Sequence, residues 1–305
     1  MNQFVECVPN FSEGHRIDTV TRLAETIASV NSAVVLGTHM DPDHNRSVIT
    51  FVASPENVVE AAVRAVALAS ELIDLRKHIG EHPRIGATDV LPFVPVRNVT
   101  MQECGLLAHQ AGRRIAAELG IPVYYYEYAA LRPDRIRLEN VRRLGFHELR
   151  EQIRIDPDRA PDAGEPRIHE SAGAVAVGAR PFLIAFNVNL RTTNIDNARK
   201  IAQAVRERDG GLPFVKALGF ELKSRGLVQV SMNLINYEVT GMTQAFAAVC
   251  NQAELHGIEI AGTEIVGLVP EAALDKGAPY FPLLENFTEA TVLENQLKGR
   301  ISDAT

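Results

Sequence analysis

The clearest pattern in the chain is an alternation of apolar and polar residues over 182–190. Large apolar side chains occupy every second position, and the positions between them include Asn187 and Asn189. A period of two predicts a β-strand with one buried face. A second alternation follows over 228–234, where the polar face carries Gln229, Ser231 and Asn233.

Apolar residues at helical spacing separate these strands from two others. Helices are expected over 194–205 and 240–256, and further strands over 214–222 and 258–266. The resulting order is strand, helix, strand, strand, helix, strand, which is the order of a ferredoxin-like unit. Its amide-rich sheet face either is exposed to solvent or lines a polar ligand cavity between two sheets.

The pattern in the first half of the chain predicts the same order of strands and helices. Ser54 and Pro55 mark the start of a long helix, and His78 and Gly80 are expected at its end. The extended segment 86–96 contains two prolines, which lack an N–H, so we expect an edge strand. The other predicted strands are 4–8, 33–37, 47–53 and 123–128. The other helices begin near 15 and at 101, where Thr100 and Glu103 are expected to form a capping box.

The segment 132–173 is polar and irregular, and we expect a linker that carries a loop. The predicted fold class is therefore α/β, of the α+β type, with two tandem ferredoxin-like units and helices on one face of each sheet.

Composition narrows the classes of function. The chain has 305 residues, 46% of them hydrophobic and 23% charged, which excludes disordered and collagen-like proteins. A net charge of −7 argues against a general binder of nucleic acid or acidic membranes. Three distant cysteines without a CxxC pair, no signal peptide and no long apolar span predict a soluble, cytoplasmic protein with reduced thiols.

The densest cluster of titratable residues follows the long helix. Pro83 favours an extended conformation at His82, which is flanked by Glu81, Arg84 and Asp89. An imidazole near its ordinary pKa can accept and return a proton at neutral pH. His82 is thus the candidate general acid and base.

The same residues also fit a zinc motif. His78, Glu81 and His82 have the H-x-x-E-H spacing of inverted zinc peptidases. That chemistry needs both histidines on one helical face, whereas Gly80 and Pro83 indicate that the helix has ended. A zinc hydrolase is the weaker alternative.

Three further places could hold a charged substrate. Asp41, Asn45 and Arg46 form either a simple turn or a loop that orients a substrate. The glycine-rich segment 164–173 exposes backbone donors, and Arg180 is suited to a carboxylate. Neither G-x-G-x-x-G nor G-x-x-x-x-G-K-[ST] occurs, so dinucleotide and P-loop sites are not expected.

Several of these segments resemble the formiminotransferase family. The matching stretches run in order from about residue 2 to 285. They are VECVPNFSEG at 5–14, NR at 45–46, GEHPR at 80–84, PFVPVR at 92–97, GAR at 178–180, FLIAFN at 182–187 and VGLVP at 266–270.

The resemblance implies transfer of a formimino group from N-formimino-L-glutamate to N5 of tetrahydrofolate, a step of histidine breakdown. It places the catalytic histidine at His82. It also implies an N-terminal subdomain over 1–179, a C-terminal subdomain over 180–305, sheets that face each other around a ligand tunnel, and a homodimer. The family's folate-binding loop falls on Gly164, Glu165, Pro166, Arg167, Ile168, His169, Glu170, Ser171, Ala172 and Gly173.

The expected chemistry assigns the remaining candidates. A formamidine is a cation, so Glu81 or Asp89 is expected to hold it, and arginines are expected to bind the carboxylates of both substrates. The predicted substrate-binding residues are Asp41, Asn45, Arg46, Glu81, Arg84, Arg180 and Asn187. A formyl donor and a non-catalytic folate-binding protein remain as alternatives.

Overall fold

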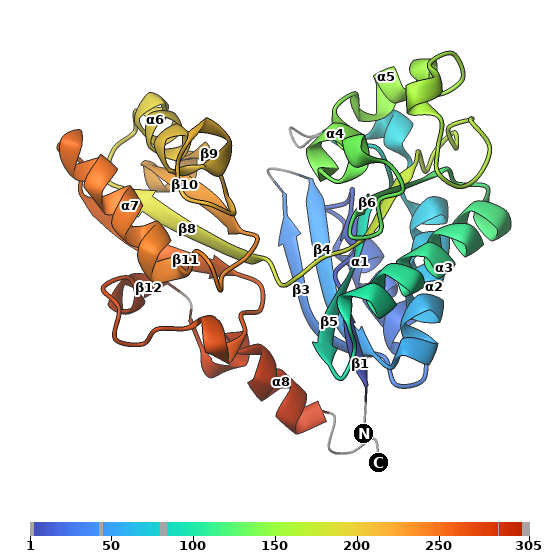
Figure 1. Cartoon of the computed structure of the whole chain (residues 1–305), viewed down its shortest axis with the longest axis horizontal. Coiled ribbons are helices and arrows are strands. Elements are labelled where there is room, and N and C mark those ends of the chain that lie inside the picture. The colour runs from blue at the N-terminus through green and yellow to red at the C-terminus, as the bar shows by residue number, and fades with distance from the viewer. Residues whose placement is uncertain (1–2, 43–44, 80–83, 286, 301–305) are drawn as a thin grey trace. The chain divides into compact units, whose positions relative to one another are not determined.

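The computed structural model describes residues 3–42, 45–79, 84–285 and 287–300. The chain divides into two compact units, Met1–Arg180 and Pro181–Thr305, and each has its own sheet and hydrophobic core (Figure 1). Among the described helices, none is long and apolar enough to cross a membrane.

The first unit contains a four-stranded antiparallel framework with the ferredoxin-like order β3-β4-β1-β5. A short strand, β2, also pairs with β4 and β5. Helices α1 and α2 pack their apolar side chains on one face of this sheet. The elements are β1 (Phe4–Cys7), β2 (Asn10–Phe11), α1 (Ile17–Ala28), β3 (Val34–Asp41), β4 (Arg46–Ala53), α2 (Pro55–Leu72) and β5 (Thr88–Arg97).

An extension widens this sheet beyond β5. Helix α3 (Met101–Leu119) leads to β6 (Val123–Glu127), and β7 (Val175–Ala179) inserts between β6 and β5 with parallel pairing on both sides. The predicted capping box of α3 is confirmed, because Thr100 and Glu103 bond each other's backbone N–H groups. The pattern analysis did not predict β7 as a strand.

The prediction that 86–96 forms an edge strand is wrong. Strand β5 pairs with β1 and β2 on one side and with β7 on the other. Pro95 is accommodated because it pairs with Val5 next to a shift of register and lies beyond the pairing with β7, which ends at Phe93. Pro92 lies inside that pairing, opposite Gly178.

The predicted end of the long helix is also wrong. Helix α2 ends at Leu72, because Ile73 turns into an extended conformation and is buried in the core. Asp74 then caps a separate 3₁₀ turn, η1 (Leu75–Lys77), by accepting from the N–H of Arg76 at 3.1 Å. The basic residues after Leu72 therefore belong to this turn.

The predicted linker 132–173 is folded in large part. It contains α4 (Leu138–Arg142) and α5 (Gly145–Gln152). Val141, Phe146 and Leu149 pack with tyrosines of β6 on the sheet face opposite to α3. The polar composition of the segment concealed this second apolar cluster.

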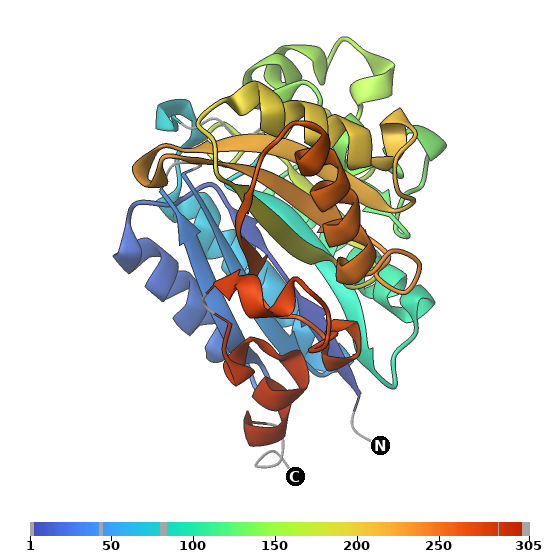
Figure 2. The same ribbon diagram turned by 90° about the vertical axis from the view of Figure 1, so that its left-hand side faces the viewer.

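The second unit has the predicted order β11-β8-β10-β9, with a short parallel strand at its edge. Helices α6 and α7 lie over one face of the sheet (Figure 2). The elements are β8 (Ile184–Leu190), α6 (Ile195–Val205), β9 (Val215–Leu222), β10 (Leu227–Leu234), α7 (Met242–Leu255), β11 (Ile260–Val266), β12 (Leu284–Glu285) and α8 (Leu293–Arg300).

The predicted fold class, two tandem ferredoxin-like units of the α/β type, is confirmed. The amide-rich face of the second sheet is not simply solvated, because Asn187, Asn189 and Gln229 are all less than 9% exposed. Of this set, Asn233 is exposed. The expected facing of the two sheets around a tunnel stays a prediction.

Candidate functional site

The β3–β4 connection carries the first group of predicted residues. Asp41 and Arg46 are paired in the strand register, and Asn45 has a left-handed backbone with φ of 47°. The amide of Asn45 accepts from Gly14 N at 2.8 Å and donates to Ile79 O at 2.9 Å. Asn45 therefore ties the loops after β2 and after η1 to the end of this hairpin.

His78 joins the same arrangement. Its Nε2 lies 3.0 Å from the carbonyl oxygen of Asn45, and the guanidinium of Arg84 contacts both ring nitrogens. Burial, followed by the charge of Arg84, lowers the pKa of His78 below its usual range. The imidazole is accordingly neutral at pH 7.

This geometry does not favour zinc at His78, because both of its ring nitrogens already face protein groups. Within the described part of the chain, no three His, Cys, Asp or Glu side chains are grouped as metal ligands. His82 and Glu81 lie outside the described residues.

Asp89 fixes the segment that follows. Its Oδ1 accepts from Ile85 N at 2.8 Å, and its Oδ2 accepts from Arg142 Nη1 at 2.9 Å. Asp89 is 4% exposed. With both oxygens occupied, this carboxylate anchors α4 to the start of β5, which makes it the weaker candidate for holding a substrate cation.

Arg46 is the most constrained of the predicted arginines. Its guanidinium donates to Asn10 Oδ1, while its Nε is buried and has no hydrogen-bond partner among the described residues. Burial and the nearby charge of Arg142 lower the pKa of Arg46, against the opposing effect of Asp89 and Asp41. The charge of Arg142 therefore acts on an Arg46 guanidinium that is largely buried.

Arg142 is a site residue that sequence reasoning missed, because the segment around it was taken for a linker. It follows Val141, whose side chain is buried, and Phe146, Leu149 and Ile153 continue the apolar spacing. That periodicity was the available signal for a packed helix pair at this position.

Arg180 directly follows β7 and lies near a buried carboxyl. Its N–H donates to Phe93 O at 3.1 Å. Glu6, in the middle of β1, is 4% exposed, and burial raises its pKa to about 7 although the charge of Arg180 acts in the opposite direction. Glu6 was also missed, and its signal is a single carboxylate in an otherwise apolar strand.

The predicted folate loop divides into two parts. Gly164, Glu165 and Arg167 line a surface hollow beside the end of α3, together with Arg113 and Gly120. In the second part, His169 and Gly173 exchange backbone hydrogen bonds of 3.1 and 2.9 Å.

This second part is fixed to both sides of the 78–86 segment. Leu75 N donates to Ser171 O at 2.9 Å, and Ala87 N donates to Ala172 O at 2.8 Å. Half of the predicted folate loop therefore contacts described residues that precede and follow the predicted catalytic histidine in the chain.

In the second unit, the amide-rich face forms a polar network around Glu264. Its Oε2 accepts from Asn187 Nδ2 at 3.2 Å and from Gln229 Nε2 at 3.3 Å. Gln229 also donates to Asn189 Oδ1 at 2.9 Å. The Oδ1 of Asn187 is buried without a hydrogen-bond partner in the described ranges, so it is available to a donor from a ligand.

Comparison with known proteins agrees with this arrangement along the whole chain. The description "formiminotransferase domain, N-terminal subdomain" matches residues 4–180, and "formiminotransferase domain" matches residues 185–301. The chain belongs to the formiminotransferase family.

Two relatives align with this chain over nearly the full length of each protein. The chain is 48% identical to a glutamate formimidoyltransferase of Thermoplasma acidophilum, over 96% of this chain and 97% of the relative. It is 44% identical to that of Streptococcus pyogenes serotype M1, over 98% and 100%. A formimidoyltransferase-cyclodeaminase of Sus scrofa is 42% identical over 94% of this chain and 54% of the longer relative.

The resemblance inferred from the sequence motifs is thereby confirmed, and the chain is a transferase of the formiminotransferase family. Several predicted site residues lie in one group of contacts in the first unit. The group consists of Asn45, Arg46, His78, Arg84, Asp89 and Arg142. Asn187 belongs to the second unit and is described there by itself.

Proposed function

We propose that the chain transfers the formimino group of N-formimino-L-glutamate to N5 of tetrahydrofolate and releases L-glutamate, as a step of histidine degradation and one-carbon metabolism. The observation that carries this proposal is the nearly full-length identity of 48% and 44% to two glutamate formimidoyltransferases. Tetrahydrofolate is then a co-substrate.

The reaction is a substitution at one carbon. The lone pair of N5 forms a bond to the formimino carbon, and His82 removes the proton from N5. The same imidazole then returns a proton to the glutamate nitrogen as the bond between that nitrogen and the carbon breaks. General acid–base catalysis of this kind is typically worth about 10²–10⁴ in rate.

The charged groups have separate tasks in this proposal. The donor carbon belongs to a cationic amidinium, and Glu81 is the favoured partner because both oxygens of Asp89 already accept hydrogen bonds. Arg46, Arg84 and Arg180 bind substrate carboxylates, for which a guanidinium offers two parallel donors. Asp41, Asn45 and Asn187 complete the substrate site, and residues 164–173 hold the folate.

The organisation of the enzyme follows from the family. We propose that 1–179 and 180–305 act as the two formiminotransferase subdomains, whose sheets enclose the ligands. The proposal includes a cytoplasmic homodimer that needs no metal, nucleic acid or membrane partner.

A direct assay of transfer tests the proposal. Purified protein is mixed with N-formimino-L-glutamate and tetrahydrofolate, and the absorbance of the methenyl-folate that acid generates from the product is followed. We expect a signal that requires both substrates and persists in EDTA. Loss of the signal in EDTA would favour the zinc alternative.

The donor is tested in parallel with N-formyl-L-glutamate. Transfer from the formyl compound but not from the formimino compound would overturn the proposed donor while leaving one-carbon transfer intact. Folate binding without transfer from either donor would indicate a binding protein.

A further inference from the structure

Arg46 and Arg142 pose a physical problem that no contact among the described residues solves. Each guanidinium has a buried Nε that lacks a hydrogen-bond partner there. A buried donor without a partner costs about 1–3 kcal/mol, and more for a charged group. Both groups are cationic, and the charge of Arg142 acts against that of Arg46, which adds repulsion.

Among the described residues, one buried carboxylate serves several cations at this position. Asp89 bonds Arg142 Nη1, and Asp41 and Asp89 both act on Arg46. Asp89 also acts on Arg84, so this one carboxylate is shared by three guanidinium groups. An anionic ligand group would give these cations a further acceptor.

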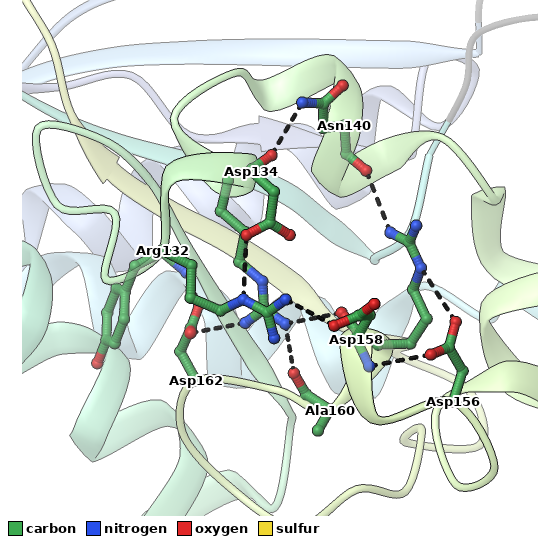
Figure 3. Close-up of polar contacts among 10 residues, drawn as sticks. Arg132, Asp134, Asn140, Asp156, Asp158, Ala160 and Asp162 are labelled. Carbon is green, nitrogen blue, oxygen red and sulfur yellow. Dashed lines mark hydrogen bonds and ion pairs between the residues drawn. The ribbon is translucent and has the colours of Figure 1, made fainter.

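Arg142 is also held rigidly in place. Its helix α4 is fixed by Asn140, which donates to Asp134 O at 2.9 Å, and the adjoining turn is fixed by a buried ion pair between Arg135 and Asp162 at 2.6 Å (Figure 3). Figure 3 also shows Arg132 reaching Asp134 and Asp158 beside this pair. A guanidinium held by such contacts loses little further entropy when it binds a ligand.

We propose that Arg46 and Arg142 together bind one substrate carboxylate, which accepts hydrogen bonds from their unpartnered Nε–H groups. The inference rests on the proposed function only in naming the source of the carboxylate. Arg142 thereby becomes a substrate-binding residue supplied by α4, and its ion pair with Asp89 orients it. The carboxylate comes either from formiminoglutamate or from the glutamate tail of the folate.

Equilibrium binding tests the pair without turnover. L-glutamate, tetrahydrofolate and tetrahydropteroate, which lacks the glutamate tail, are titrated calorimetrically into the wild type, Arg46→Met, Arg142→Met and the double variant. Arg143→Met is the matched control, because Arg143 is the exposed neighbour of Arg142. Circular dichroism verifies that each variant is folded.

Each single variant is expected to bind one carboxylate ligand about 10- to 100-fold more weakly, since hydrogen bonds to charged groups contribute about 1.5–3 kcal/mol. The double variant is expected to bind little more weakly than either single variant, because both arginines serve the same carboxylate. If tetrahydrofolate binds more weakly while the affinity for tetrahydropteroate is unchanged, the bound carboxylate belongs to the folate tail. If L-glutamate binds more weakly, the carboxylate belongs to the formimino donor.

Two results would overturn the pair. The first is that folded Arg142→Met binds both carboxylate ligands with unchanged affinity. If Arg142→Met does not fold, Arg142→Lys is measured in its place. The second is full additivity of the two substitutions. If Arg142-dependent binding persists while the transfer assay fails, the proposed function is wrong and the carboxylate site stands.

Discussion

Glu6 makes the stability of the first unit depend on pH. Its pKa is about 7 in the folded protein because of burial, against an ordinary value of 4.5. The folded state therefore binds this proton more tightly than the unfolded state does. The resulting stabilisation is fully present below pH 4.5 and is lost as the pH rises through 7.

We therefore expect Glu6→Gln to stabilise the protein at pH 8 by roughly 3 kcal/mol and to change little at pH 4.5. Urea unfolding followed by circular dichroism at both pH values measures the difference. Glu25→Gln, on the exposed face of α1, is the control. An equal effect of Glu6→Gln at the two pH values would show that the carboxyl is not protonated on folding.

His82→Ala tests the proposed acid and base. Because no other group would then transfer the proton, kcat should fall by about 10²–10⁴, while the Kd for tetrahydrofolate stays within a few-fold of the wild type. His256→Ala, at an exposed position of the second unit, is the control. Near-normal turnover in His82→Ala would remove this residue from the mechanism.

Sequence reasoning could propose those candidate site residues that stand out by type and local spacing. Arg46 and Arg84 lie beside prolines, glycines and acidic residues, where a loop and a charge are both visible in the sequence. Arg142 and Glu6 were missed because their roles depend on which distant segments bury them. Burial and long-range pairing are properties of the folded chain.

At the scale of elements, two glycines with left-handed backbone conformations allow backbone strain to be compared with steric crowding of an added side chain. Gly173 has a φ of +74°, and an added Cβ would lie 2.1 Å from the carbonyl oxygen of Ile85. Gly120 has a φ of +64° with open space around it.

Gly120→Ala is expected to cost about 1–2 kcal/mol of stability from backbone strain. Gly173→Ala should cost roughly 2 kcal/mol more, because the Ile85 carbonyl must move away. Urea unfolding measures both, and tetrahydrofolate affinity should fall only for Gly173→Ala. Equal costs at the two positions would indicate that the 168–173 turn can shift freely.

The buried ion pair of Arg135 and Asp162 holds the helical segment after β6. Both side chains are 5% exposed, and Arg135 also donates to the carbonyl of Ala160 at 2.6 Å. Arg135→Met leaves Asp162 buried without its partner, and a loss of about 3–5 kcal/mol is expected in urea unfolding.

Arg132→Met is the comparison, because Arg132 is 36% exposed and pairs with exposed carboxylates. Its expected cost is below about 1 kcal/mol. Similar losses in the two variants would mean that burial does not set the strength of these pairs.

Local signals located the starts of elements better than their ends. The Thr100 capping box and the start of the helix predicted over 194–205 depend on contacts within three residues, and both are confirmed. The end of α2 depends instead on burial of Ile73, and the interior place of β5 depends on β7, about 80 residues later. Neither can be deduced from local pattern.

At the scale of the whole molecule, the repeated period of helices and strands was sufficient to predict two ferredoxin-like units. It did not predict the added strand β7 or the α4–α5 pair of the first unit, whereas the strand predicted over 123–128 is confirmed as β6. That extension supplies Arg142, so the part of the fold that departs from the repeat also contributes to the candidate site.

The family resemblance makes a prediction about both units at once. If folate lies between the two sheets, its binding should protect backbone amides in β4 of the first unit and in β10 of the second. Asn187, on β8 beside β10, has a buried Oδ1 with no hydrogen-bond partner among the described residues, and this feature of the second unit favours contact with a ligand donor.

Hydrogen exchange with and without tetrahydrofolate measures this protection. We expect slower exchange over Arg46–Ala53 and Leu227–Leu234 and no change in α7, which packs on the opposite face of the second sheet. Asn187→Ala should weaken the ligand-induced protection of β10 more than that of β4, because the orphaned acceptor lies in the second unit. Protection confined to the first unit would overturn the tunnel between the sheets and would restrict folate to the loops around Arg46 and 168–173.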